Sequence, residues 1–222
     1  MSRAFRTSIV LAVLAVPPAP IAARQSAEAA IETARLGGVT IACRHGITNH
    51  SRDDAEVVRY DDLTTQRLLS AEGEAQSRQM GDAFRQLGIP VHDVVASPMH
   101  RAWFMGELMF GRVRIDSIWY TADGNYGGPR RDARARVLAE TTGDSVRVII
   151  SHLSTLLSVL PSARGQLEEG SCAVVRPGGG AFDVVGIVPW QAWLSAAGRS
   201  GGETQAPRPA TSRERAVGRA GR

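Results

Sequence analysis

The stretch VTIACRHGITNH (residues 39–50) runs from an apolar segment directly into an arginine and a histidine. Residues 39–43 are apolar or β-branched, which is typical of a strand buried on both faces. Arg44, His45 and Gly46 follow without a spacer. Because burying a charged group costs free energy, this order indicates that the strand ends at the rim of a site.

Strands and helices alternate along the rest of the chain. Strands are predicted at 39–43, 91–96, 113–118 and 146–150, and helices at 71–87, 99–110, 130–140 and 154–160. A hairpin is predicted from 173–176 and 182–188, with its turn at 177–180, before a last helix at 189–196. This alternation predicts an α/β fold, a three-layer α/β/α sandwich with a mostly parallel central sheet.

Two further predicted strands lead to residues of the same kind. Arg101 follows the strand at 91–96 within one helical turn, and His152 follows the strand at 146–150 after a single serine. The carboxyl ends of parallel strands meet at one edge of a sheet, where ligands bind. The sequence therefore predicts one site lined by Arg44, His45, Arg101 and His152.

The segments that carry these residues resemble, in order, the motifs of the histidine phosphatase superfamily, the phosphoglycerate-mutase-like proteins. CRHG (43–46) resembles the Arg-His-Gly signature, and LLSAEG (68–73) and SPMHRA (97–102) resemble the helix and turn that follow it. VIISHLSTLL (148–157) resembles the second-histidine segment. The stretch at 169–193 resembles the C-terminal hairpin of small exported bacterial members. The resemblance covers about residues 38–195.

The resemblance implies a phosphomonoester hydrolase. His45 would be the nucleophile and would be transiently phosphorylated on a ring nitrogen. Arg44 and Arg101 would hold the phosphoryl oxygens, because guanidinium groups pair bidentately with them and stay charged. His152 would stabilise charge during transfer.

The resemblance also implies supporting groups. Gly46 would let the backbone approach the phosphate, and the hydroxyl of Thr48 would line the pocket as a second substrate-binding residue. No metal or other cofactor is implied, because the arginines supply the positive charge. A general acid would come from Asp123, with Asp116 and Asp132 as alternatives, although Asp123 equally suits an Asp-Gly-Asn turn.

Departures from the family pattern keep a second hypothesis open. Ile47, Ser51 and Met105 occupy positions where other residues are usual in the family. They suggest a pseudoenzyme, an exported anion-binding domain of the same fold without turnover. A metal-dependent hydrolase would need ligands such as His45, His50, Asp53 and Asp54, whose spacing matches no recognised metal motif.

The spacing of the two histidines bears on the substrate. His45 and His152 are 107 residues apart, which leaves little room for a long insertion over the site. An open pocket suits a phosphoprotein or a small phosphoester, and it argues against a mutase that shields its intermediate from water. No oligomeric state is predicted.

The charges argue against a nucleic-acid partner. The chain has 222 residues and a net charge of +4, and all 26 basic residues are arginine. Between residues 28 and 197, however, 17 arginines face 20 acidic residues, a net charge of −3. The excess of arginine lies at the ends, and residues 198–222 are predicted to be a disordered arginine-rich tail.

The first 27 residues have the composition of a signal peptide. Arg3 and Arg6 precede a short apolar run at 8–16, and cleavage is expected after Ala23 or Ala29. The apolar run is too short to span a bilayer, so no stable membrane insertion is expected after cleavage. The sequence thus predicts export to the periplasm or the medium, with residues 28–197 as the single folded domain.

Cys43 and Cys172 are the only two cysteines of the chain. Both lie in apolar, strand-like segments, and a domain of this size needs no disulfide scaffold. Buried free thiols are therefore the prediction. A bridge between the two, which an oxidising compartment would permit, is the alternative.

Overall fold

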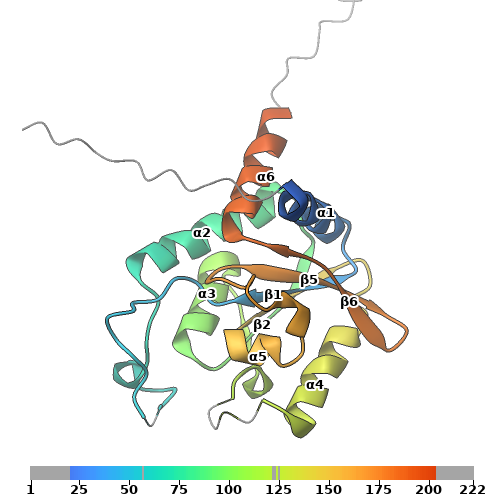
Figure 1. Ribbon diagram of the computed structural model, residues 1–222. Helices are drawn as coiled ribbons and strands as arrows, with labels where there is room; N and C mark the ends of the chain where they lie inside the picture. Colours follow the sequence, from blue (N-terminus) through green and yellow to red (C-terminus); the bar gives the residue numbers. More distant parts are fainter. Residues whose placement is uncertain (1–20, 57, 122–123, 125, 204–222) are drawn as a thin grey trace, which may run out of the picture.

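The computed structural model describes residues 21–56, 58–121, 124 and 126–203, and its centre is a six-stranded sheet of order β3-β2-β4-β1-β5-β6 (Figure 1). The strands are β1 (Val39–Arg44), β2 (Val91–Ala96), β3 (Arg114–Ile115), β4 (Val146–Ser151), β5 (Cys172–Gly178) and β6 (Ala181–Val188). β1 to β4 are parallel, and β5 and β6 add an antiparallel hairpin beside β1. The predicted mostly parallel sheet is confirmed.

Helices cover both faces of the sheet and complete the predicted three layers. One face packs against α1 (Ile21–Leu36), α2 (Ala71–Gln86), α3 (His100–Phe110) and α6 (Trp190–Glu203), the other against α4 (Gly128–Ala139) and α5 (Leu153–Leu157). Successive residues of β1 point to opposite faces of the sheet. Ile41 and Cys43 belong to the core under the first group of helices, and Ala42 belongs to the core under α4 and α5. This alternation is why a strand buried on both faces reads as a continuous apolar run.

The predicted helix ends agree with the observed caps. Ser70 Oγ accepts a hydrogen bond of 3.0 Å from the Gly73 N–H and begins α2. Gly88, at a φ of 67°, follows α2, and Gly111, in the left-handed region at 65°, closes α3. Local side-chain chemistry therefore sets these boundaries.

Two predicted elements are shorter in the structure. The expected strand at 113–118 is reduced to the two residues of β3. Asp116 then accepts a hydrogen bond of 3.0 Å from the Ile118 N–H and starts a 3-10 turn, Ser117–Trp119. The expected helix at 154–160 ends at Leu157 as α5, and a second 3-10 turn, Pro161–Ala163, follows.

The helices at the two ends differ from the predicted domain boundaries. α1 spans Ile21–Leu36, so it crosses the expected boundary between residues 27 and 28, and it buries Ala27 and Ala30 against the sheet. α6 continues to Glu203, into the region predicted as a tail. Residues 1–20 and 204–222, which hold most of the predicted signal peptide and tail, lie outside the described residues. No helix in the described part is both long and apolar enough to cross a membrane.

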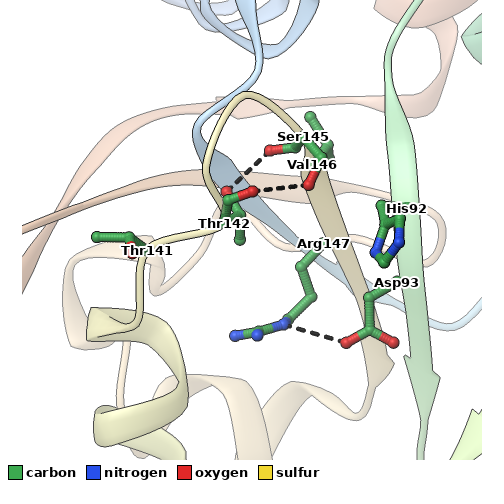
Figure 2. A pocket seen from close by; sticks show the side chains of 7 residues that line it. All are labelled: His92, Asp93, Thr141, Thr142, Ser145, Val146 and Arg147. Carbon is green, nitrogen blue, oxygen red and sulfur yellow. Dashed lines mark hydrogen bonds and ion pairs between the residues drawn. The ribbon is translucent and has the colours of Figure 1, made fainter.

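The amino ends of the strands border a cavity of about 330 Å³. Figure 2 shows His92 and Asp93 of β2 beside Arg147 of β4, whose guanidinium pairs with Asp93 at 3.2 Å. A second cavity, of about 520 Å³, lies between α4 and the β5–β6 hairpin. Neither is lined by the predicted site residues, which follow the opposite ends of the strands.

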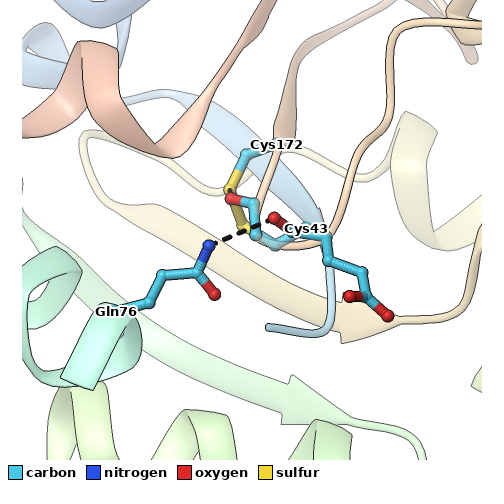
Figure 3. The surroundings of a disulfide bond; sticks show 5 residues. Cys43, Gln76 and Cys172 are labelled. Atoms are coloured by element: carbon cyan, nitrogen blue, oxygen red, sulfur yellow. Dashed lines mark hydrogen bonds between the residues drawn. A yellow bond between two sulfur atoms is a disulfide. The ribbon is translucent and has the colours of Figure 1, made fainter. Parts of the chain in front are cut away.

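Cys43 and Cys172 form a disulfide, so the prediction of free thiols is wrong. The two residues are direct cross-strand partners of β1 and β5, with their Cα atoms 3.9 Å apart (Figure 3). They are 129 residues apart in the sequence, and only the pairing of β5 with β1 brings them together. The bridge lies directly before Arg44 and His45.

Candidate active site

The structure brings the predicted histidines together at the carboxyl edge of the sheet. His45 follows β1 and His152 follows β4, the strand parallel to β1. Their ring centroids are 5.3 Å apart. Arg101, in the first turn of α3, is close enough for its charge to lower the pKa of both rings. Side chains at strand ends from separate parts of the chain thus lie close together, as expected for a parallel sheet.

The hydrogen bonds of His45 define which ring nitrogen is free. Nδ1 lies 2.9 Å from the Gly46 carbonyl oxygen, which can only accept, so we assign the ring proton to Nδ1. The lone pair of Nε2 is then free to attack. The backbone is held as well, because the His45 N–H donates to Ser151 O and its carbonyl accepts from the Gly170 N–H, both at 2.9 Å.

His152 is oriented by a serine that the sequence analysis did not single out. Ser97 Oγ lies 2.7 Å from His152 Nε2, and it also accepts the Met99 N–H at 3.2 Å. A hydroxyl can donate one hydrogen bond and accept two, so the Met99 bond leaves both directions open to it; we assign the hydroxyl proton to Nε2, which puts the ring proton of His152 on Nδ1. That N–H is buried and has no hydrogen-bond partner among the described residues.

Both imidazoles are neutral near pH 7. Burial lowers the pKa of His45 well below its usual value, and Arg101, Arg44 and Arg67 lower it further, against the raising effect of the bond to Gly46. Burial also lowers the pKa of His152, and so do His45 and the same arginines. A neutral imidazole keeps its lone pair for nucleophilic attack.

The two predicted clamp arginines each pair with a carboxylate. Arg101 is 5% exposed and binds Asp54 bidentately, at 2.9 and 3.0 Å. Arg44 donates to the Leu167 carbonyl at 3.1 Å, and its other terminal nitrogen lies 3.6 Å from Glu169. These contacts fix the guanidinium groups without using all of their donors.

Arg67 is a third arginine of the site, which the sequence analysis missed. Its charge lowers the pKa of His45, His152 and Arg44. It lies in the irregular segment before α2, where its backbone N–H donates to Asp54 at 2.7 Å. Because no strand leads into this segment, position in the chain gave no signal for it.

Unpaired donors mark where an anion would bind. The buried Nε atoms of Arg44, Arg67 and Arg101 and Nδ1 of His152 have no hydrogen-bond partner in the described part of the chain. Buried polar groups are normally hydrogen-bonded, so each such donor calls for an explanation. A ligand that accepts several charge-assisted hydrogen bonds would satisfy them together.

The two predicted substrate-binding residues have other contacts in the structure. A Cβ on Gly46 would come within 2.8 Å of Gln76 Oε1, so the absence of a side chain allows close packing on α2. Thr48 Oγ1 donates to Glu169 at 2.8 Å. The same carboxylate lies 3.1 Å from His50 Nε2, which makes Glu169 a further residue that the sequence analysis missed.

The two candidate general acids that the structure describes, Asp116 and Asp132, make contacts away from the two histidines and the arginines near them. Asp116 caps the 3-10 turn and lies 3.6 Å from Arg114. Asp132 is exposed and lies 3.8 Å from Arg131. Asp123 lies outside the described residues. Among the described residues, no three His, Cys, Asp or Glu side chains are grouped in a way that could hold a metal ion.

The fold can be compared with solved structures. The protein histidine phosphatase SixA complexed with tungstate is 17% identical, with a TM-score of 0.52 over 69% of this chain and 97% of SixA. The chain has the histidine phosphatase fold.

The histidine phosphatase fold is shared with a second solved structure. Phosphoserine phosphatase from Entamoeba histolytica, in complex with 3-phosphoglyceric acid, is 16% identical, with a TM-score of 0.51 over 70% of this chain and 99% of the neighbour. No family model matches the sequence. No curated protein matches it either. At this level of identity the similarity establishes the fold, and the chemistry has to be argued from the site.

Proposed function

We propose that the protein is a phosphomonoester hydrolase that works through a phosphohistidine on His45 and needs no metal ion. One observation carries the proposal: Arg44, Arg67, Arg101 and His152 lie near a neutral His45, and each has a buried donor without a hydrogen-bond partner among the described residues. A phosphoryl group offers the negative oxygens that these donors lack. Phosphoryl transfer depends mainly on positioning and charge stabilisation, which such a site supplies.

The reaction follows from the assigned protons. His45 Nε2 attacks phosphorus, the bond to the leaving oxygen breaks, and that oxygen takes a proton from water. The proton stays on Nδ1, and its hydrogen bond to the Gly46 carbonyl stabilises the positively charged imidazole that forms. A second water then attacks phosphorus and gives a proton to the hydroxide that the first water left, the N–P bond breaks, and inorganic phosphate leaves. The arginines and His152 Nδ1–H bind the phosphoryl oxygens in both steps.

The fold neighbours support the class of substrate. SixA binds tungstate, a tetrahedral oxyanion, and the phosphoserine phosphatase binds 3-phosphoglyceric acid. A phosphorylated small molecule or a phosphoprotein would present the same kind of group to this site. We propose no nucleic-acid partner, because the charge of residues 28–197 is net negative.

Trapping the intermediate tests the mechanism. A rapid quench with a ³²P-labelled phosphomonoester should label the intact chain with a phosphoryl group that is stable in base and labile in acid. Peptide mapping should place the label on His45, and a strong chelator should leave both labelling and turnover unchanged. Label on another residue, or turnover that the chelator abolishes, would contradict the proposal.

A second candidate is an anion-binding protein of the same fold without turnover. The observation that favours it is that Asp54 and Glu169 already contact the guanidinium groups of Arg101 and Arg44. Such a protein would bind inorganic phosphate or tungstate in calorimetry but would neither become labelled nor release phosphate. The quench experiment therefore separates the two candidates.

We also propose that the protein is exported. A buried disulfide persists in oxidising compartments and is rare in the cytosol. Of the two expected cleavage points, the one after Ala23 suits α1 better, because cleavage after Ala29 would remove the buried Ala27. Mass spectrometry of the mature protein should show an N-terminus at Arg24, and a full-length cytoplasmic chain would contradict the proposal.

A further inference from the structure

The three tyrosines of the chain lie near one another, and one of them contacts a ring of the histidine pair. The ring centroid of Tyr120 lies 5.1 Å from that of His152, edge to face, and Tyr60 lies 6.0 Å from Tyr120 in the same manner. Burial raises the pKa of Tyr120, and the nearby Asp54, Tyr60 and Tyr126 raise it further. We call Tyr60, Tyr120 and Tyr126 the tyrosine cluster.

Tyr120 is fixed relative to the catalytic edge of the sheet. Its carbonyl accepts a hydrogen bond of 3.0 Å from Arg130. The carbonyl of the preceding residue, Trp119, accepts a hydrogen bond of 2.7 Å from Ser151 Oγ. Ser151 ends β4 and directly precedes His152. The residue after Tyr120 is held as well, because Thr121 Oγ1 accepts a hydrogen bond of 2.6 Å from the buried Arg134. These contacts fix the backbone that carries the ring, and the half-buried ring itself packs against His152, so it needs little ordering when a ligand arrives.

Tyr60 is held by its backbone while its side chain is open to solvent. Gln66, which is fully buried, donates to the Tyr60 carbonyl at 3.3 Å and accepts the His100 N–H at 2.8 Å. This links the Tyr60 segment to the residue directly before Arg101. Tyr60 itself is 47% exposed, so its ring is accessible to a ligand.

We propose that the tyrosine cluster binds an aromatic ring of the substrate, so that the preferred substrates are phosphomonoesters with the phosphate on or one carbon away from a planar ring. This inference rests on the proposed function, because it takes the hydrolysis of a phosphomonoester as given. What it adds is the kind of leaving group, an aromatic one. Tyrosine gives a large apolar contact at little cost in conformational entropy, and aromatic rings favour one another in edge-to-face or offset stacking. The exposed ring of Tyr60 and the half-buried ring of Tyr120 could contact an aromatic ring of the substrate in this way.

The shared chemistry is an aromatic phosphomonoester, either free or as phosphotyrosine in a peptide. A saturated ring of the same size would fill the same space without the edge-to-face electrostatics. Phosphonates with a benzyl or a cyclohexylmethyl group therefore form a matched pair, and because neither can be hydrolysed, binding is measured apart from turnover.

The experiment is calorimetry of the full chain, disulfide intact, with these two phosphonates. Benzylphosphonate should bind about fivefold more tightly than cyclohexylmethylphosphonate. Tyr60→Phe should keep this ratio, since it keeps the ring, and Tyr60→Leu should bring it close to one. Leu63→Ala, an exposed residue of the same segment, is the matched control and should leave the ratio unchanged.

The outcomes separate this inference from the proposed function. Equal binding of the two phosphonates by the unmodified chain overturns the tyrosine proposal alone. A benzyl preference without hydrolysis of benzyl phosphate supports the tyrosine proposal and overturns the hydrolase, and failure to bind either phosphonate overturns both. A phosphonate analogue of phosphotyrosine bound more tightly in a short neutral peptide than alone would identify a protein substrate, and equal binding would identify a small one.

Discussion

Replacement of His45 by alanine should lower the turnover of an aryl phosphate by at least about 10⁴-fold, because no other imidazole in the site has a free, correctly placed lone pair. His152 is held by Ser97 and presents an N–H to the site, so it cannot take over the attack. Steady-state assays of phosphate release measure the effect.

Two controls give this result its meaning. His45→Ala retains Arg44, Arg67 and Arg101, so it should still bind tungstate, which shows that the site remains formed. His92→Ala changes an exposed histidine at the opposite end of the sheet and should leave turnover unchanged. Less than a tenfold loss in His45→Ala, with tungstate binding intact, would exclude His45 as the nucleophile.

Removal of the disulfide should have the largest effect on stability. The double substitution Cys43→Ala/Cys172→Ala should lower the free energy of unfolding by about 2–5 kcal/mol, because the bridge closes a long loop of the unfolded chain. Both cysteines are fully buried, so the lost sulfur contacts add to the cost. Chemical denaturation measures the change.

Reduction of the unmodified protein is the matched control. Reductant should lower its stability toward that of the double variant and should not change the variant itself. A thiol titration in denaturant without reductant should find no free thiol in the unmodified chain. Two free thiols, or an unchanged free energy of unfolding in the variant, would contradict the bridge.

Local signals were sufficient for most of the fold. The apolar run before Arg44, the N-cap at Ser70 and the glycine at 111 act within a few residues, and the elements that they bound lie close to their predicted ranges. β3 was overestimated because the turn made by Asp116 ends the strand early. The whole of α1 was missed: its residues up to 27 were assigned to the signal peptide and no helix was predicted after them, whereas packing against the sheet makes the alanine-rich segment helical.

The amino-acid sequence by itself determined that Arg44, His45, Arg101 and His152 stand at strand ends, and a parallel sheet then brings such ends to one edge. Only the tertiary structure decided what surrounds them. Glu169 meets Thr48 across 121 positions of the chain, and Cys43 meets Cys172 across 129. Contacts of that range depend on how the hairpin β5–β6 pairs with β1, and no local pattern of residues encodes that pairing.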